Sequence, residues 1–372
     1  MEHLAPMSRV AVTVEQSWHR VPGGTAWSVL ELLRALRDVP GLEVVAVAAR
    51  HSEPPPDPWV PPVEVRQLPL PRNVLYETWH LPFARFPKVE RATGPVDVVH
   101  ATAVMYPASD APVVVTVHDL AFLDSPLLAT KHGHRLFRRG TELARSEAAL
   151  VVCPSETTRR ACLADGFAPE RLRVVPWGVA ATRATAADIA SAKAAHGLTT
   201  PYALFCGTVE PRKNLPALLA AFAEVERRDV PLVLAGPAGW HQDLSAAIAA
   251  LGDRVRPVGF LPRRELDALI AGAAVVCYPS TSEGFGLPVL EAMAQGAPVV
   301  TSSGTATEEV AGDAAALVDP HDVASITAAL DRVLGDDEYA AMLRAKGPAR
   351  AAQFSWEATA AAYAAVYRDA AR

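Results

Sequence analysis

The sequence has few cysteines, no excess of positive charge and no long apolar run. Its four cysteines stand singly in apolar or mixed contexts without CxxC spacing, which indicates buried free thiols in a reducing compartment. The formal net charge is -6 at pH 7, so no overall positive field would attract nucleic acid or anionic lipid to the surface as a whole. A polyanion would have to bind at a local basic site, and we expect no nucleic-acid partner.

The sequence also lacks the segments that carry a protein into or across a membrane. Its start, MEHLAPMSRVAVTV, has neither the basic region nor the long apolar core of a signal peptide. No later run approaches the roughly 18 uninterrupted apolar residues that a membrane-spanning helix needs. We therefore expect a cytoplasmic protein, with peripheral contact at the inner face of the membrane left open.

One basic segment, KHGHRLFRRGTELAR, bears on that open point. It carries Lys131, Arg135, Arg138, Arg139 and Arg145. These side chains can approach an anionic lipid or a phosphorylated acceptor. A solvated helix face explains the same charges more simply, so the segment by itself identifies no partner.

From Arg9 onward, short β-branched runs alternate with segments of helical period, which is the pattern of parallel sheets with crossover helices. A chain of 372 residues, half of them hydrophobic, favours two domains over one. We expect strands at 9–14, 43–49, 63–68, 96–101, 113–119 and 150–154, and in a second half at 202–207, 231–236, 254–259, 275–280 and 298–302. We expect helices at 25–38, 214–228, 241–252, 262–273 and 287–296.

Between these elements we expect three irregular segments. Gly23-Gly24 should form a loop, and the proline-rich stretch from Pro54 to Pro71 should be an exposed loop around the short strand expected there. Residues 180–200 form a polar, alanine-rich connection between the halves. The domains are therefore expected at 8–177 and 178–354.

The last segment, 355–372, is an amphipathic helix that can cap either half. The residues near one face of it are Trp356, Ala360, Tyr363 and Tyr367.

The most informative segment is SEGFGLPVLEAMAQG, residues 282–296. Pro288 suits the first helical position and Gly296 a left-handed C-terminal stop, so a helix of about two turns should lie between them. Gly286 then lies in the loop before the helix. Its amide and that of Leu287 can approach a phosphate, whose charge the helix dipole favours.

Two glutamates border the same place. Glu283 lies on the loop and Glu291 on about the first turn of the helix, so both carboxylates can accept hydrogen bonds from the hydroxyls of one ligand. Taken singly, Glu291 is explained by the helix dipole and Glu283 by an exposed loop.

A second motif, GTVEPRKN at residues 207–214, follows the expected strand YALFC. Arg212 and Lys213 emerge at its carboxyl end, and Asn214 suits the cap of the next helix. Ligands of open α/β sheets bind at such strand ends, where the two cations can neutralise a diphosphate. Alone, a loop Arg-Lys pair is more often solvated surface.

Together, EGFGLPVLE and GTVEPRKNL resemble the retaining glycosyltransferases of the GT-B class, GT4 type (glycosyl transferases group 1), which include bacterial mannosyltransferases. The resemblance covers nearly the whole chain, because Gly23-Gly24 resembles the family's N-terminal glycine loop, TVHDL its histidine segment and VVPWGV its domain crossing. Trp177, where asparagine is common, and the Thr25–Trp27 segment after the glycines depart from the pattern, so the resemblance says least about the acceptor.

The resemblance implies an α/β protein of two Rossmann-like domains facing across a cleft. The N-terminal domain would bind the acceptor, the C-terminal domain the donor, and helix 355–372 would cross back to the first domain. The implied chemistry is hexose transfer with retention at the anomeric carbon.

The resemblance also implies a role for each candidate site residue. Arg212 and Lys213 would hold the donor diphosphate, Glu291 the ribose and Glu283 the transferred sugar. The remaining members of the implied site are His118, which would face the donor sugar, and Gly24, Gly286 and Leu287, which would bind the donor.

The expected donor is GDP-mannose, with UDP-glucose as the alternative. The acceptor is a glycan, a lipid-linked molecule or a small molecule. No cofactor or metal is expected, because Arg212 and Lys213 can offset the charge of the leaving group. Two rival functions stay open: an epimerase or phosphorylase of the same architecture, and a non-catalytic nucleotide-sugar binding protein.

Overall fold

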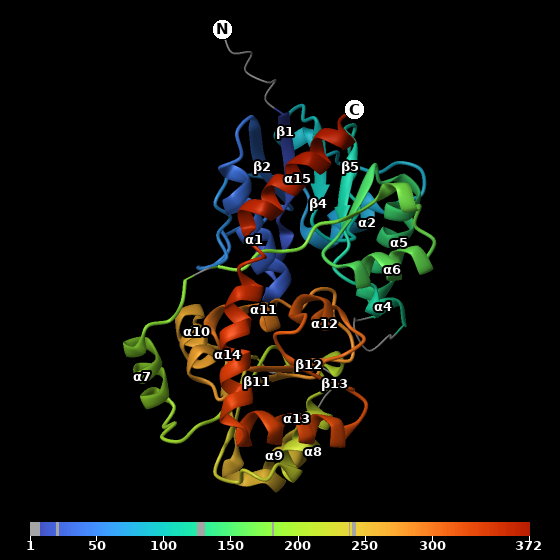
Figure 1. The fold of residues 1–372 in the computed structure, drawn as a ribbon. Helices are drawn as coiled ribbons and strands as arrows, with labels where there is room; N and C mark the ends of the chain where they lie inside the picture. The colour runs from blue at the N-terminus through green and yellow to red at the C-terminus, as the bar shows by residue number, and fades with distance from the viewer. Residues whose placement is uncertain (1–7, 20–21, 125–130, 181, 238, 240–242) are drawn as a thin grey trace. The chain divides into compact units, whose positions relative to one another are not determined.

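The chain forms two compact α/β units (Figure 1). The computed structural model describes residues 8–19, 22–124, 131–180, 182–237, 239 and 243–372. The first unit runs to Gly178 and includes Ser355–Arg372; the second is Val179–Phe354.

The first unit is built on a seven-stranded sheet with the order β3-β2-β1-β4-β5-β6-β7. Its strands are β1 (Ser8–Thr13), β2 (Leu42–Ala48), β3 (Val65–Gln67), β4 (Val98–Ala101), β5 (Val113–Thr116), β6 (Leu150–Cys153) and β7 (Leu172–Val174). Every pairing in the described sheet is parallel. This is the strand order of the doubly wound dinucleotide-binding fold, with the order reversing between β1 and β4.

Helices connect the strands of the first unit. They are the 3-10 turn η1 (Glu15–Trp18), α1 (Gly23–Arg37), α2 (Arg72–Trp79), α3 (Glu90–Thr93), α4 (Ala121–Asp124), α5 (Lys131–Glu147), α6 (Glu156–Ala164), the 3-10 turn η3 (Pro169–Arg171) and α15 (Trp356–Ala370). All four residues of β4, β5 and β6 are buried. Central parallel strands are covered on both faces, which explains why these strands are mostly apolar and why even their polar residues, His100 and Thr116, are buried.

The second unit repeats the plan with a six-stranded parallel sheet of order β10-β9-β8-β11-β12-β13. Its strands are β8 (Ala203–Cys206), β9 (Leu232–Ala235), β10 (Val255–Gly259), β11 (Val275–Tyr278), β12 (Val299–Ser302) and β13 (Ala316–Val318). Its helical elements are α7 (Ala186–Ala195), η4 (Pro211–Lys213), α8 (Leu215–Glu224), α9 (Ser245–Leu251), η5 (Gly252–Arg254), α10 (Arg263–Gly272), α11 (Leu287–Gln295), α12 (Ala306–Ala311), α13 (Val323–Gly335) and α14 (Asp337–Ala351). Here the strand order reverses between β8 and β11. The predicted α/β class, with two Rossmann-like sheets, is confirmed.

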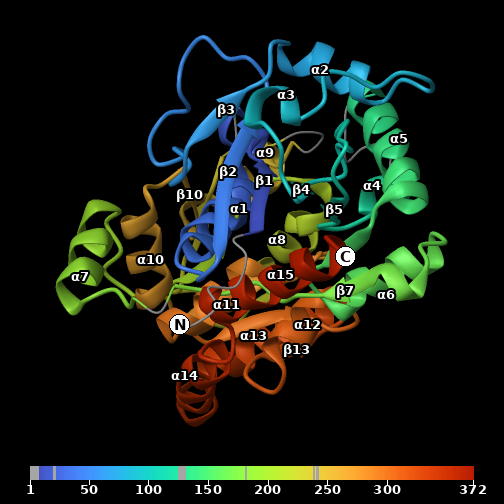
Figure 2. The same cartoon turned by 90° about the horizontal axis from the view of Figure 1, so that it is seen from above.

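Helix α15 follows the second unit in sequence but belongs to the first unit, where it packs against α1 and β5 (Figure 2). The predicted apolar face is confirmed, because Trp356, Ala360, Tyr363 and Tyr367 are all buried. The two tyrosine hydroxyls are hydrogen-bonded inside the unit. Tyr363 bonds Thr116 at 2.9 Å and Tyr367 bonds Nδ1 of His100 at 2.8 Å.

Three expectations about irregular segments were wrong in part. Gly23 and Gly24 begin α1 and do not form a loop. The 180–200 connection contains α7, whose start is fixed by a capping box between Thr185 and Asp188. The stretch from Pro54 to Pro71 holds β3, and the strand is three residues long where six were expected.

Two further expectations concern cysteines and membranes. The four cysteines are free and buried, as predicted. Within the described residues, no helix is both long and apolar enough to cross a membrane. The helix expected at 241–252 is α9, which starts at Ser245; positions 241 and 242 lie outside the described residues.

Candidate functional site

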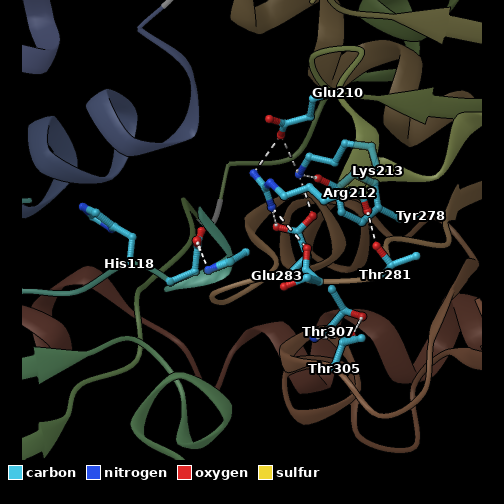
Figure 3. Close-up of polar contacts among 12 residues, drawn as sticks. His118, Glu210, Arg212, Lys213, Tyr278, Thr281, Glu283, Thr305 and Thr307 are labelled. Carbon is cyan, nitrogen blue, oxygen red and sulfur yellow. Dashed lines mark hydrogen bonds and ion pairs between the residues drawn. The ribbon is translucent and has the colours of Figure 1, made fainter. Parts of the chain in front are cut away.

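Polar side chains gather in the second unit where β8 and β11 end (Figure 3). These neighbouring strands flank the point where the strand order reverses, which is where open α/β sheets bind ligands. The 3-10 turn η4 follows β8 and carries Arg212 and Lys213, while Glu283 follows β11. The two sequence motifs therefore meet in one place.

Glu283 bridges the two cations. Its Oε2 accepts a hydrogen bond from Nη1 of Arg212 at 2.5 Å, and its Oε1 accepts one from Nζ of Lys213 at 2.6 Å. Each carboxylate oxygen retains a second lone pair for another donor. Glu210 completes the cluster, with Oε1 at 2.8 Å from Nη2 of Arg212 and 3.9 Å from Nζ of Lys213. Two acids thus balance two bases.

The cluster is buried, and burial governs its ionisation. Glu283 is 9% exposed and Lys213 is 6% exposed. Burial by itself would raise the pKa of Glu283, but the charges of Arg212 and Lys213 outweigh it and lower that pKa to about 2. Burial and the charge of Arg212 lower the pKa of Lys213, against the opposing pull of Glu283 and Glu210. The negative charge of a bound phosphate would raise the pKa of Lys213 and favour its ammonium form.

Tyr278, at the end of β11, forms one wall of this cluster. Lys213 donates a hydrogen bond to its hydroxyl, and the ammonium lies 4.7 Å from the centre of its ring. Burial, followed by the charge of Glu283, raises the pKa of Tyr278 well above its ordinary value. The phenol is neutral at pH 7 and holds the lysine in place.

The loop between Glu283 and α11 brings backbone amides to the same site. Gly286 precedes α11 with a φ of 108°, and a Cβ there would lie 2.9 Å from Cγ2 of Thr307. Val289 and Leu290 both donate to the carbonyl of Gly286, and proline at position 288 has no amide hydrogen. The amides of Gly286 and Leu287 are therefore the ones that this helix end offers to an anion.

Helix α11 begins at Leu287, as the expected range of 287–296 has it. Pro288, expected to be the first helical residue, is therefore the second, and Glu291 is the fifth, in the second turn. The predicted left-handed stop at Gly296 is confirmed by its φ of 78°. Asn214, expected to cap α8, occupies the cap position without capping. It is left-handed, with a φ of 59°, and donates its side-chain amide to the carbonyls of Pro279 and Pro320.

Glu291 is buried and paired with Arg263, the first residue of α10. Arg263 donates to Oε1 of Glu291 and, through Nε, to Oδ2 of Asp267 at 3.0 Å. Burial would lower the pKa of Arg263, but Glu291 and Asp267 outweigh it and raise that pKa further above neutrality. The guanidinium is a permanent charge that orients the Glu291 carboxylate.

His118 belongs to the first unit, just after β5. Its Nε2 lies 2.6 Å from the carbonyl oxygen of Thr102, which can only accept, so Nε2 carries the proton. Burial lowers the pKa of His118, so the ring is neutral and its Nδ1 has a free lone pair. Within the described residues Nδ1 has no hydrogen-bond partner. The ring of Trp177 lies 5.2 Å away.

Gly24, the remaining predicted site residue, is the second residue of α1 and has open space around the position of a Cβ. Three of the predicted site residues, Arg212, Lys213 and Glu283, contact one another and lie together with Glu210 and Tyr278 (Figure 3). Glu291 is held separately by Arg263.

Comparison with known proteins identifies the chain. The model of Glycosyltransferase Family 4 matches residues 22–183, and that of Glycosyl transferases group 1 matches residues 187–350. The chain is 34% identical over 281 residues to a D-inositol 3-phosphate glycosyltransferase of Frankia alni, a match that covers 70% of this chain and 69% of that protein. This chain belongs to glycosyltransferase family 4. The family resemblance found in its motifs is confirmed.

Other relatives match only part of the chain. It is 44% identical over 162 residues to O-antigen chain mannosyltransferase B of Escherichia coli, a match that covers 42% of each chain. For three curated relatives, this one included, the match spans only 42% to 59% of the relative's own length. A structure of Anabaena HepE in complex with UDP-glucose superimposes with a TM-score of 0.75 at 20% identity, covering 96% of this chain and 98% of that chain. That likeness confirms the GT-B type of fold.

Three residues of the site were not predicted from the sequence. Glu210 lies inside the motif that was singled out, but only its contact with Arg212 distinguishes it from an exposed loop acid. Tyr278 was expected only as a residue inside the strand at 275–280. Arg263 lies 28 positions before Glu291, in a segment read only as a helix start. The charge of Arg263 in that first helical turn, where acids are usual, was the one available signal.

Proposed function

We propose that this glycosyltransferase moves a hexose, mannose in the first instance, from a nucleoside-diphosphate sugar to a hydroxyl-bearing acceptor with retention at the anomeric carbon. The observation that carries the proposal is the buried cluster of Arg212, Lys213 and Glu283 beside the amides of Gly286 and Leu287. Charge-paired cations next to helix-end amides suit a diphosphate that gains negative charge as it leaves.

Each residue has a proposed part in that step. Arg212 and Lys213 would neutralise the departing diphosphate, whose charge would also restore the depressed pKa of Lys213. Glu283 would use its remaining lone pairs to accept from hydroxyls of the transferred sugar. Glu291, oriented by Arg263, would accept from the ribose hydroxyls.

The first unit would contribute His118 to the same reaction. A neutral imidazole with an unprotonated Nδ1 can accept a hydrogen bond from a sugar hydroxyl. Gly24 stays a predicted donor-binding residue. The acceptor is proposed to be a glycan, a lipid-linked molecule or a small molecule.

The donor is proposed as GDP-mannose. Support comes from relatives that are named mannosyltransferases in Escherichia coli and Mycolicibacterium hassiacum. UDP-glucose is the second candidate, because HepE was solved with that molecule. We also propose a cytoplasmic location with peripheral contact at the inner face of the membrane. Four buried free thiols support a reducing compartment.

The test is an assay of the purified chain against a panel of nucleotide sugars, following release of nucleoside diphosphate, epimerisation and phosphorolysis in parallel. We expect diphosphate release with GDP-mannose above UDP-glucose. Arg212→Ala and Lys213→Ala should each lose about a hundredfold in rate while remaining folded, since removing one preorganised donor commonly costs that much.

Lys346→Ala is the matched control, because that lysine pairs with Asp313 at an exposed position of the same unit. Its turnover should equal that of the wild-type chain. Normal rates in both Arg212→Ala and Lys213→Ala, or epimerised sugar as the only product, would overturn the proposal. His118→Ala should impair both transfer and donor hydrolysis; if both are unchanged, the histidine is structural.

A further inference from the structure

An apolar edge lies on the first unit, at α2 and the residues that follow it. We define this edge as Val74, Leu81, Phe83 and Phe86. Phe83 is 98% exposed and Phe86 51% exposed. Within the described residues, these four are half of the eight large apolar side chains that are exposed, yet they occupy only 13 consecutive positions. Scattered exposed apolar residues are ordinary, but such a cluster marks a surface for interaction.

The backbone that presents the apolar edge is anchored on both sides. Nε1 of Trp79, which is buried, donates to the carbonyl of Pro87 at 2.8 Å. Arg85, between the two phenylalanines, forms an ion pair with Glu147 at the end of α5 and lies 5.4 Å from the centre of the Tyr106 ring. The phenylalanines are therefore held outward by a fixed segment.

The surroundings of the apolar edge are basic in a chain that is acidic overall. Residues 72–91 and helix α5 together carry nine lysines and arginines against four glutamates, and two of those cations, Lys88 and Arg145, pair with Asp110 and Asp165 just outside these segments. The cations still outnumber the acids when both aspartates are counted, whereas the whole chain has a net charge of -6. Arg135 pairs with Glu77, which brings α5 beside α2, and the two helices lie on one side of the unit in both views (Figures 1 and 2). Arg135 and Arg138 are exposed on α5.

We propose that the apolar edge and helix α5 dock this glycosyltransferase on an anionic lipid bilayer. Phe83 and Phe86 would enter the region between head groups and acyl chains, where aromatic rings are favoured, while the basic side chains contact lipid phosphates. The excess of positive charge favours an anionic bilayer over a second copy of this acidic chain. This deepens the membrane part of the proposed function and is independent of the donor and the reaction.

The experiment is co-sedimentation of the full chain with vesicles of phosphatidylglycerol and phosphatidylcholine, compared with phosphatidylcholine alone. We expect binding to the anionic vesicles that weakens as salt is added. The double variant Phe83→Ser/Phe86→Ser should bind them at least tenfold more weakly, and so should Arg135→Gln/Arg138→Gln. Phe260→Ser is the matched control, because Phe260 is 64% exposed in the second unit; it should bind like the wild type.

Circular dichroism checks that each variant is folded, and release of nucleoside diphosphate from the donor checks its catalysis, so a loss of vesicle binding can be told apart from a loss of either. The phenylalanine variant should match the wild type in both, so a chain without transferase activity still tests the membrane proposal. Wild-type binding by the phenylalanine variant would overturn the proposal, as would absence of binding to anionic vesicles at low salt. The proposal would also be overturned if light scattering showed a dimer of the wild-type chain and a monomer of the phenylalanine double variant. That result would mean that the apolar edge mediates self-association.

Discussion

At the scale of single residues, the ionisation of Glu283 ties the site to the stability of the second unit. Its pKa falls from an ordinary value of 4.5 to about 2 in the folded chain. A lowered pKa means that the stabilisation is complete above pH 4.5 and is lost as pH falls towards 2. For a carboxylate this buried, the loss is on the order of 3 kcal/mol in the free energy of unfolding.

Glu283→Gln provides the measurement. At neutral pH the variant should be less stable, because Arg212 and Lys213 lose their shared partner. The gap between the variant and the wild type in urea unfolding should narrow as pH falls from about 5 towards 2, since the wild-type carboxyl then becomes neutral too. Exposed Glu357→Gln is the control. A gap that stays constant with pH would contradict the ion-paired state of Glu283.

Arg263 is a positioning residue, and its effect should reach the nucleotide through Glu291. Replacing Arg263 by Met leaves the buried Glu291 carboxylate without this permanent positive charge. Affinity for free nucleoside diphosphate should fall about tenfold, and Arg263→Lys should restore part of it. Arg264→Gln is the neighbouring control, since Arg264 is exposed and pairs with Asp188. If calorimetry finds that Arg263→Met and Arg264→Gln bind nucleoside diphosphate with equal affinity, Arg263 does not position Glu291 for binding.

At the scale of elements, the start of α11 depends on a glycine. Gly286 has a φ of 108°, and a Cβ would meet Thr307 at 2.9 Å. Gly286→Ala should therefore move the two amides and weaken diphosphate binding about tenfold or more. Gly304→Ala is the matched control, because Gly304 has a φ of 72° but open space around it. If calorimetry finds the two variants equally weakened, backbone strain in general, and not the helix end, explains the loss.

The elements that the sequence predicted well are those whose burial is complete. Strands β4, β5 and β6 are buried at every position and mostly apolar, and α15 shows its period because one of its faces packs on the first unit. Helix α7 was missed, because alanine-rich residues of mixed polarity give it no apolar stripe, with only Ala192 buried. Strand β13 is three residues long and gives too short a pattern.

The site was predictable as two motifs but not as a set of contacts. Backbone geometry at Gly286 and Gly296 follows from residue type, so it could be inferred locally. The pairs that define the electrostatics join residues far apart in the chain, namely Arg212 with Glu283 and Arg263 with Glu291. Which acid meets which base depends on the packing of the sheet, and a single sequence does not contain that information.

At the scale of the whole molecule, we propose that the protein's own side chains neutralise the charge of the leaving group. In the proposed function, Arg212, Lys213 and the amides of Gly286 and Leu287 would offset the charge of the leaving diphosphate, so we predict that transfer does not need a divalent cation. Turnover in the presence of a chelator should stay within about twofold of the untreated rate, a change far smaller than the loss of one such donor. A large loss on chelation that added Mg²⁺ or Mn²⁺ restores would contradict this prediction.

The central claim is that the second unit binds a nucleotide sugar with a division of labour between two glutamates, and calorimetry on two variants tests it directly. Glu291→Ala should weaken binding of free nucleoside diphosphate about tenfold, because a buried acceptor for the ribose is lost. Glu283→Ala should leave the free nucleotide within about threefold of the wild-type affinity and weaken the intact sugar donor at least tenfold. Equal weakening of the free nucleotide by both substitutions, or no effect of either, would contradict the account.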